Sequence, residues 1–376
     1  TGELAVIAIQ VEPPDFPGKA GGQGGDHEIA KQTTMQFSAG WDWIQATPDR
    51  NTGLWDKVSL SYSGEVELDD PWVRTETLAV KGSAAAKEVS FGARNWGGVR
   101  ENITAHVSIW YGGERATEDV TQDLVVDSGG AHGVEIALKI EDAHLWWPHT
   151  MGSPSMYAAY ISLSDQSGVL LDCKKIPFGI RTISTFISPV TQGRAFAINR
   201  RKVFLEGGNW IQTDQMLRYA SNSLRYYNEV RMHREMGMNF IRVWGGGTAE
   251  RPEFYEACDA LGVLVMQEFW MTGDNNGRWA GNYSWPLSHP EYNSCIEDTI
   301  KQLRGHPSLF FWCAGNELEP VDENPSPDIA AALTHSLQVL DGTRPLVRSS
   351  MTTPEDFDPE KALCPQDGPY GLLTQD

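Results

Sequence analysis

A carboxylate and an amide stand side by side directly after a short apolar run. The run Leu-Phe-Phe-Trp-Cys fills residues 309–313, between Pro307 and Gly315, and Asn316 and Glu317 follow it. A continuous apolar run of this length, bounded by residues that break regular structure, is typical of a strand buried on both faces. In a barrel of parallel strands, residues at the carboxyl ends of the strands face the reaction site. The pattern therefore predicts that Asn316 and Glu317 project into such a site.

This pair of residue types suits acid–base chemistry on a sugar. Cleavage of a glycosidic bond needs a carboxylic acid that protonates the leaving oxygen. The pKa of that acid must be raised by its surroundings, so that it carries a proton near neutral pH. The amide of Asn316 can bond a ring hydroxyl beside Glu317. Short motifs also occur by chance, as a loop or a helix cap, so the surrounding chain must decide between the two interpretations.

The region from 185 to 376 alternates apolar runs with amphipathic segments. Strands are predicted at 203–205, 240–243, 263–266, 309–313 and 346–349, and helices at 224–236, 251–261, 290–304 and 328–340. Repeated strand–helix units indicate a parallel sheet, and five in succession with short connections favour a (β/α)8 TIM barrel over a doubly wound sheet. This region is accordingly predicted to be an incomplete TIM-barrel catalytic domain.

Two further observations favour the barrel. The chain contains no glycine-rich phosphate loop of either nucleotide-binding form, which also disfavours a dehydrogenase. Polar and aromatic residues gather at the ends of four successive predicted strands: Asn209 and Trp210, Arg242 and Trp244, Gln267 and Trp270, Asn316 and Glu317.

The chain before this region is predicted to be all β. Short strand patterns recur about every 8–12 residues within 65–184, as in a sandwich of immunoglobulin type; they lie at 73–78, 88–93, 103–111, 124–126, 134–140, 156–163 and 170–176. Trp146 and Trp147 interrupt this pattern and are expected to pack between domains. Residues 1–64 are interpreted as the C-terminal part of another, sugar-binding-like (jelly-roll) β-sandwich, with strands at 4–11, 41–44 and 54–60.

Composition excludes several classes of function. The chain has 376 residues and a formal net charge of −20, with 50 acidic against 30 basic residues, which argues against binding nucleic acid or anionic membranes. The five Cys and nine His are scattered without metal-ligand spacing, so neither a metal nor another cofactor is expected. Fourteen Trp residues suit core packing and sugar stacking alike. Sequons at Asn102 and Asn282 lean toward a vacuolar, lysosomal or extracellular location, and the oligomeric state stays open.

Several longer motifs resemble glycoside hydrolase family 2, and within it the β-mannosidase and endo-β-mannosidase branch. They are Asp-Arg-Asn-Thr-Gly-Leu-Trp-Asp at 49–56, Gly-Gly-Asn-Trp-Ile at 207–211, Arg-Val-Trp-Gly-Gly-Gly at 242–247 and Gln-Glu-Phe-Trp-Met-Thr-Gly-Asp at 267–274. The order of the three predicted domains is also similar to that of the family. The resemblance covers almost the whole chain and implies a hydrolase that acts on a β-linked mannoside or related glycan.

The resemblance also implies roles for individual residues. It implies a retaining mechanism with two carboxylates about 5 Å apart, in which Glu317 is the acid/base. Asn316 would bind the 2-hydroxyl of the sugar, and Arg242 would orient a carboxylate through a bidentate pair, with Glu268 as a supporting partner. The other residues that it places at the substrate are Trp210, Asp214, Trp244, Gln267 and Trp270.

The chain departs from the family at the nucleophile, which is expected on a later strand. None of the acidic residues after 346 ends an apolar run, so we expect the sequence to stop short of the nucleophile and this chain to be inactive on β-mannosides. Two alternatives stay open. One is an exo-β-glucosaminidase, galactosidase or glucuronidase of the same family, and the other is a carbohydrate-binding fragment without catalysis.

Overall fold

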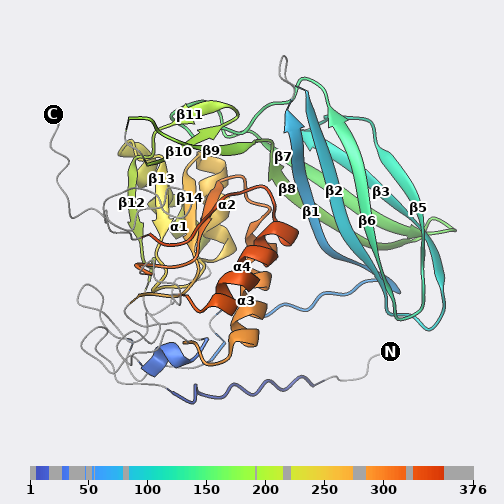
Figure 1. Cartoon of the computed structure of the whole chain (residues 1–376). Helices are drawn as coiled ribbons and strands as arrows, with labels where there is room; N and C mark the ends of the chain where they lie inside the picture. The colour runs from blue at the N-terminus through green and yellow to red at the C-terminus, as the bar shows by residue number, and fades with distance from the viewer. Residues whose placement is uncertain are drawn as a thin grey trace.

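The computed structural model describes residues 6–16, 28–33, 47, 53–54, 56–78, 84–190, 193–214, 222–273, 285–318 and 325–350. An antiparallel sandwich stands on the right of Figure 1, and a parallel sheet with its helices stands on the left. The predicted fold class, a β-sandwich followed by part of a TIM barrel, is confirmed.

The sandwich consists of two antiparallel sheets. One sheet has the order β1 (Val66–Leu78), β2 (Ala85–Asn95), β6 (Ala131–Ile140). The other has the order β4 (Glu114–Arg115), β3 (Glu101–Tyr111), β7 (Met156–Asp165), β8 (Leu170–Gly179), and β5 (Val120–Val126) also pairs with β3. Burial alternates residue by residue along β2, because successive side chains of a strand point to opposite faces. All seven strands predicted for this region lie within these elements.

The N-terminal strands predicted at 4–11 and 54–60 are not found where the structure describes the chain. Residues 6–11 and 56–60 form no strand. Their apolar side chains are exposed, with 82% of Val6 and 85% of Leu60 accessible to solvent. A strand needs a hydrogen-bonded neighbour to be stable, and apolar alternation alone does not supply one. The predicted strand around Trp41-Asp42-Trp43-Ile44 lies outside the described residues.

Five parallel strands follow each other in chain order through the second body. They are β12 (Gly207–Trp210), β13 (Phe240–Val243), β14 (Leu264–Glu268), β15 (Leu309–Cys313) and β16 (Leu346–Val347). Helices α1 (Ser223–Glu235), α2 (Pro252–Leu261), α3 (His289–Leu303) and α4 (Pro327–Leu340) alternate with them. This order is that of a barrel wall, since a doubly wound sheet reverses its strand order at a switch point.

The strand predicted at 203–205 is wrong as the first strand of this sheet. Val203 ends β11 (Arg201–Val203), which pairs antiparallel with β10 (Arg194–Ile198) and, through it, with β9 (Ile183–Ile187). The side chain of Asn239 then binds the backbone on both sides of residue 205, at the Phe204 oxygen (2.8 Å) and the Glu206 nitrogen (2.9 Å). The parallel ladder therefore begins only after this segment.

The first residue of the first parallel strand, Gly207, is a glycine for a steric reason. A Cβ on Gly207 would lie 1.7 Å from the backbone oxygen of Phe240 on the neighbouring strand. Only glycine permits this approach of β12 to β13. A Gly-Gly pair is typical of a turn, which is why the sequence pattern predicts this strand a few residues too early.

Trp146 packs between the two bodies, as predicted. It is fully buried, and its indole Nε1 donates to the backbone oxygen of Asp259 on α2 at 2.9 Å. It belongs to one apolar cluster with Leu264 and Phe310 of the parallel sheet, and Trp147 packs against the same cluster. The sandwich is thus fixed to the amino-terminal end of the parallel strands.

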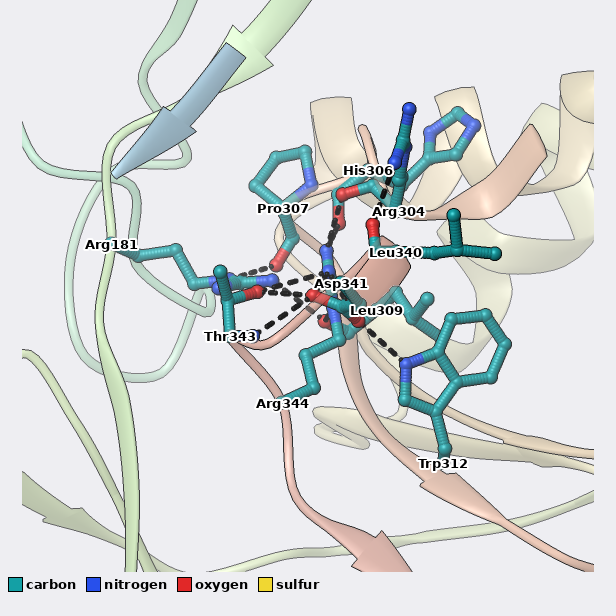
Figure 2. Close-up of polar contacts among 10 residues, drawn as sticks. All are labelled: Arg181, Arg304, His306, Pro307, Leu309, Trp312, Leu340, Asp341, Thr343 and Arg344. Atoms are coloured by element: carbon teal, nitrogen blue, oxygen red, sulfur yellow. Dashed lines mark hydrogen bonds and ion pairs between the residues drawn. The ribbon is translucent and has the colours of Figure 1, made fainter. Parts of the chain in front are cut away.

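A cluster of arginines makes the second connection between the two bodies. Arg181, just after β8, donates to the backbone oxygens of Pro307 and Leu309, at 2.8 and 2.9 Å. Arg344 donates to the same Leu309 oxygen at 2.7 Å, and Asp341 neutralises it from the end of α4. Figure 2 shows the side chains of Arg181, Asp341 and Arg344 gathered beside Leu309, the first residue of β15. The strand that leads to Asn316 and Glu317 is therefore held at its beginning by both bodies.

Candidate active site

The parallel strands present different side chains on their two faces. Trp210, Val243 and Trp312 belong to the core beneath helices α1 to α4. Met266 and Cys313 belong to a separate core on the opposite, inner face. Strand alternation places Arg242 and Glu268 on this inner face as well.

Arg242 joins the carboxyl ends of three strands on the inner face. Its Nε and Nη2 donate to Oε1 and Oε2 of Glu268 at 2.9 and 3.0 Å, so the pair is bidentate. Its Nη2 also donates to Oδ1 of Asn316 at 2.6 Å, and its Nη1 donates to Oδ1 of Asn209 at 3.0 Å. One guanidinium therefore sets the positions of groups from β12, β14 and the segment after β15.

The charges in this cluster hold one another in place. The Glu268 side chain is fully buried, and its Oε2 accepts from the backbone nitrogen of Gly245 at 2.6 Å. Burial is the largest influence on the pKa of Arg242 and lowers it, but the carboxylates of Glu268 and Glu317 raise it, and the net pKa lies above its usual value. A buried ion pair is a poor source of stability, because desolvation offsets the attraction. Its placement at the strand ends suits orientation instead.

Asn316 and Glu317 leave β15 in a fixed conformation. The Asn316 nitrogen donates to the Met271 oxygen at 2.9 Å, and the Gly273 nitrogen donates to the Asn316 oxygen at 2.8 Å. Asn316 is buried, whereas Glu317 is partly exposed and has a φ of 48°. Residues with a Cβ seldom occupy this left-handed region, and such strain is concentrated at functional sites.

Two glycines let the backbone reach this arrangement. A Cβ on Gly273 would lie 1.9 Å from the backbone oxygen of Glu317, and a Cβ on Gly245 would lie 2.9 Å from the oxygens of Phe269 and Met271. These positions belong to the motifs at 242–247 and 267–274. Close packing of the backbone near Asn316 and Glu317 therefore explains one glycine of each motif, Gly245 and Gly273.

Trp210 and Gln267, both predicted to contact substrate, lie on the helix side of the sheet. The Trp210 indole nitrogen donates to Oε1 of Glu250 at 2.8 Å, within the outer core. Gln267 accepts from the Tyr255 hydroxyl at 2.5 Å and donates to the backbone oxygen of Glu268 at 2.7 Å. The structure therefore does not bring these two side chains to the inner face with Arg242.

The remaining predicted pocket residues are Trp270, Trp244 and Asp214. Trp270 packs edge-on against Tyr292 of α3, with ring centroids 5.6 Å apart, on the helix side. Trp244 follows β13 and is buried, and its ring covers Gly246, where a Cβ would lie 1.9 Å from the indole Cη2. Asp214 is partly exposed in the segment after β12.

Sequence reasoning missed a buried carboxylate and a hydroxyl near these residues. Glu250 accepts from Trp210 and from the Tyr226 hydroxyl at 2.9 Å, and burial raises the pKa of its carboxyl group. Ser350 contacts both Arg242 and the backbone of Glu317. Glu250 follows no predicted strand, whereas Ser350 directly follows the strand predicted at 346–349, and that position at a strand end is the signal that could have found it.

The described part of the chain shows neither a metal-binding cluster nor a membrane-spanning helix. Among those residues, no group of three or more His, Cys, Asp or Glu side chains is arranged to hold a metal ion. None of the described helices has both the length and the apolar character needed to cross a membrane.

Family models match most of the chain. The model of glycosyl hydrolases family 2 matches residues 66–181, and the TIM barrel domain model of the same family matches residues 190–359. The two matches correspond to the sandwich and to the parallel sheet with its helices.

Individual relatives agree with this assignment. The chain is 36% identical to a mannosylglycoprotein endo-beta-mannosidase from Lilium longiflorum, over 98% of this chain and 41% of that protein. It is 31% identical to beta-mannosidase B from Aspergillus clavatus, over 80% of this chain and 34% of that protein. The chain therefore spans well under half the length of these curated relatives.

A solved structure shows the same arrangement. The crystal structure of a beta-D-mannosidase from Dictyoglomus thermophilum superimposes on 93% of this chain with a TM-score of 0.75 and 25% sequence identity, and the chain covers 41% of that structure.

Proposed function

The chain belongs to glycosyl hydrolases family 2, and from this membership we propose that the protein at its natural length hydrolyses β-mannosides with retention of configuration. The observation that carries the proposal is the strained Glu317 beside an Asn316 that Arg242 holds in place, at the carboxyl end of β15. This is the edge of a barrel at which catalytic residues are found.

Glu317 is proposed as the acid/base of a two-step reaction. In the first step its carboxylic acid protonates the leaving glycosidic oxygen, while a second carboxylate attacks the anomeric carbon. In the second step the resulting carboxylate removes a proton from water, which attacks the same carbon and releases the sugar. The partial exposure of Glu317 is consistent with a group that must meet both a substrate and water.

Asn316 is proposed to bind the sugar hydroxyl next to the reacting carbon. Arg242 donates to its Oδ1, which leaves the amide nitrogen as the donor available to a ligand. A donor held rigidly in this way needs no rearrangement when charge develops in the transition state. Arg242 therefore acts through Asn316 and does not need to touch the substrate.

The second carboxylate is not assigned to a described residue. A retaining enzyme needs it about 5 Å from the acid/base. The Glu268 carboxylate is engaged by Arg242 in a bidentate pair and by the Gly245 nitrogen. Its role is proposed to be the orientation of Arg242, as its burial and pairing indicate.

The preference for mannose is supported by the relatives from Lilium longiflorum and Aspergillus clavatus, whose names state mannosidase activities. It is tested by assaying the protein at its natural length on p-nitrophenyl β-D-mannoside, β-D-glucosaminide, β-D-galactoside and β-D-glucuronide. We expect the highest kcat/KM on the mannoside, with the β-anomer of mannose as the first product by NMR. A higher value on another glycoside, or the α-anomer as first product, would contradict the proposal.

A further inference from the structure

Ser350 lies just beyond β16 and holds the chain on both sides of Asn316. Its backbone nitrogen donates to the oxygen of Gly315 at 3.3 Å. Its side-chain Oγ accepts from the backbone nitrogen of Glu317 at 3.0 Å. These two contacts continue the connection between β15 and β16 beyond the end of the regular ladder.

The side chain is needed because the backbone pairing ends before Glu317. Cys313 pairs with Val347, and the Ala314 nitrogen donates to the Val347 oxygen at 2.9 Å. Glu317 then turns into the left-handed region, where its N–H cannot continue a parallel ladder. A buried or partly buried N–H needs an acceptor, and the hydroxyl of Ser350 provides it.

The same oxygen also contacts the guanidinium that holds Asn316. Arg242 Nη2 donates to Ser350 Oγ at 3.1 Å. A hydroxyl oxygen has two acceptor positions, and here one is used by Glu317 and the other by Arg242. The backbone of Glu317 is therefore tied, through a single atom, to the cation that also binds Glu268 and Asn316.

We propose that Ser350 is a positioning residue that keeps Glu317 in its left-handed conformation and at a fixed distance from Arg242. This proposal rests on the proposed function, in which Glu317 is the acid/base. Without the hydroxyl, Glu317 loses the acceptor for its N–H and can relax to the negative φ that residues with a Cβ prefer. Its carboxyl group then no longer meets the leaving oxygen in the geometry that proton transfer requires.

The test compares S350A and S350T with a matched control, S308A, in the protein at its natural length. Ser308 is fully buried at the other end of β15, and its Oγ has no hydrogen-bond partner among the described residues. Ser308 directly precedes β15, so S308A removes a buried hydroxyl next to this strand without removing a contact to Glu317. S350T keeps an oxygen at the same position and serves as the conservative rescue.

The kinetic readout separates positioning from simple loss of stability. On a β-mannosyl oligosaccharide, a poor leaving group, we expect S350A to lower kcat by about 10- to 100-fold, the effect of a small misplacement of a reacting group. KM should change little, and the basic limb of the pH profile, which reports the acid, should move. S350T should restore most of the activity, and S308A should resemble the wild type in kcat and in pH profile.

A crystallographic readout decides the proposal even if the enzyme activity proves to be different. We expect Glu317 to have a positive φ in the wild type, S350T and S308A, and a negative φ in S350A. A positive φ in S350A, or an unchanged kcat on the oligosaccharide in an active enzyme, would overturn the positioning role. If the wild type hydrolyses no β-mannoside, the proposed function fails, and the φ of Glu317 in S350A still decides whether Ser350 positions it.

Discussion

Replacing Asp341 by alanine tests the buried charges that connect α4 to the start of β15 (Figure 2). Asp341 is 1% exposed, and it accepts from the Trp312 indole nitrogen at 2.7 Å and from Arg344 Nη1 at 2.9 and 3.0 Å. The Arg344 side chain is itself only 2% exposed. The substitution removes the carboxylate and leaves the guanidinium in place.

The expected loss of stability in D341A follows from the Arg344 guanidinium, which stays buried without its carboxylate partner. Removing one partner of a buried ion pair typically costs about 3–5 kcal/mol, because the other charge stays desolvated. Arg181 increases the expected loss of stability. Burial, and then Arg344, lower the pKa of its guanidinium, and Asp341 is one of the charges that raise this pKa and so favour the charged form. We therefore expect D341A to lower the free energy of unfolding by about 3–5 kcal/mol, out of roughly 5–15 kcal/mol for a whole domain.

The assay is urea unfolding followed by circular dichroism, with D328A as the control. Asp328 lies in the first turn of the same helix, and its side chain is 59% exposed and pairs with His289. An exposed pair contributes about 0–1 kcal/mol, so D328A should change the stability little. A loss for D341A of under about 1 kcal/mol, no larger than that for D328A, would refute the reasoning, since it would mean that Arg344 is solvated after the change.

The same residue gives a dependence on pH. Burial is the largest influence on the pKa of Asp341 and raises it, but Arg344 and the hydrogen bonds from Thr343 and Trp312 outweigh it, and the net pKa lies below its usual value. A lowered pKa in the folded state contributes stability above the unfolded value of about 3.9 and loses it as the pH falls through the folded pKa. The advantage of the wild type over D341A should therefore shrink as the pH falls below about 4.

Two other substitutions have definite expected outcomes. Lys87 is buried, contacts Thr75 Oγ1 at 2.8 Å, and has a pKa that burial, and then Arg181, place well below its usual value. Because the pKa of Lys87 is lower in the folded than in the unfolded state, stability rises with pH until the unfolded pKa of about 10.4. K87M should therefore stabilise the protein at pH 7. Thermal melts between pH 7 and 9.5 should show that the variant lacks the rise in stability that the wild type has. G273A should lower both stability and activity, because its Cβ would lie 1.9 Å from the backbone oxygen of Glu317. The control is G305A, which should change neither because there is open space at its Cβ. Equal effects of the two substitutions would show that the close approach at Gly273 is unimportant.

Much of the parallel sheet could be predicted from the sequence because its strands are unusually clear. The run at 309–313 has the bounds of β15, since His306-Pro307 and Gly315 end it sharply on both sides. β12 was misplaced, since its Gly-Gly start looks like a turn and only the approach to Phe240 explains it. Because the strand was predicted at 203–205 and not at 207–210, the sequence could not show which side chains of β12 face inward.

The sequence predicted only part of the site, because here too a predicted strand boundary was wrong. The family resemblance implied a bidentate pair of Arg242 with a carboxylate, and in the structure Glu268 is that carboxylate. The sequence predicts a strand that ends at 266, with Gln267 and Glu268 after it, but β14 continues through both residues. Adjacent residues of a strand face opposite sides, so the two cannot line one pocket. Contacts such as that of Ser350 with Glu317 join distant parts of the chain and leave no local pattern.

The acid/base role of Glu317 is tested most directly by measuring kcat of E317Q in the protein at its natural length on two substrates. A β-mannosyl oligosaccharide has a leaving group that needs protonation, whereas 2,4-dinitrophenyl β-D-mannoside does not. We expect kcat on the oligosaccharide to fall by about 10²- to 10⁴-fold, the usual contribution of general acid catalysis, and the first step on the aryl mannoside to be largely preserved. Hydrolysis of the oligosaccharide by E317Q at the wild-type rate would contradict the assignment.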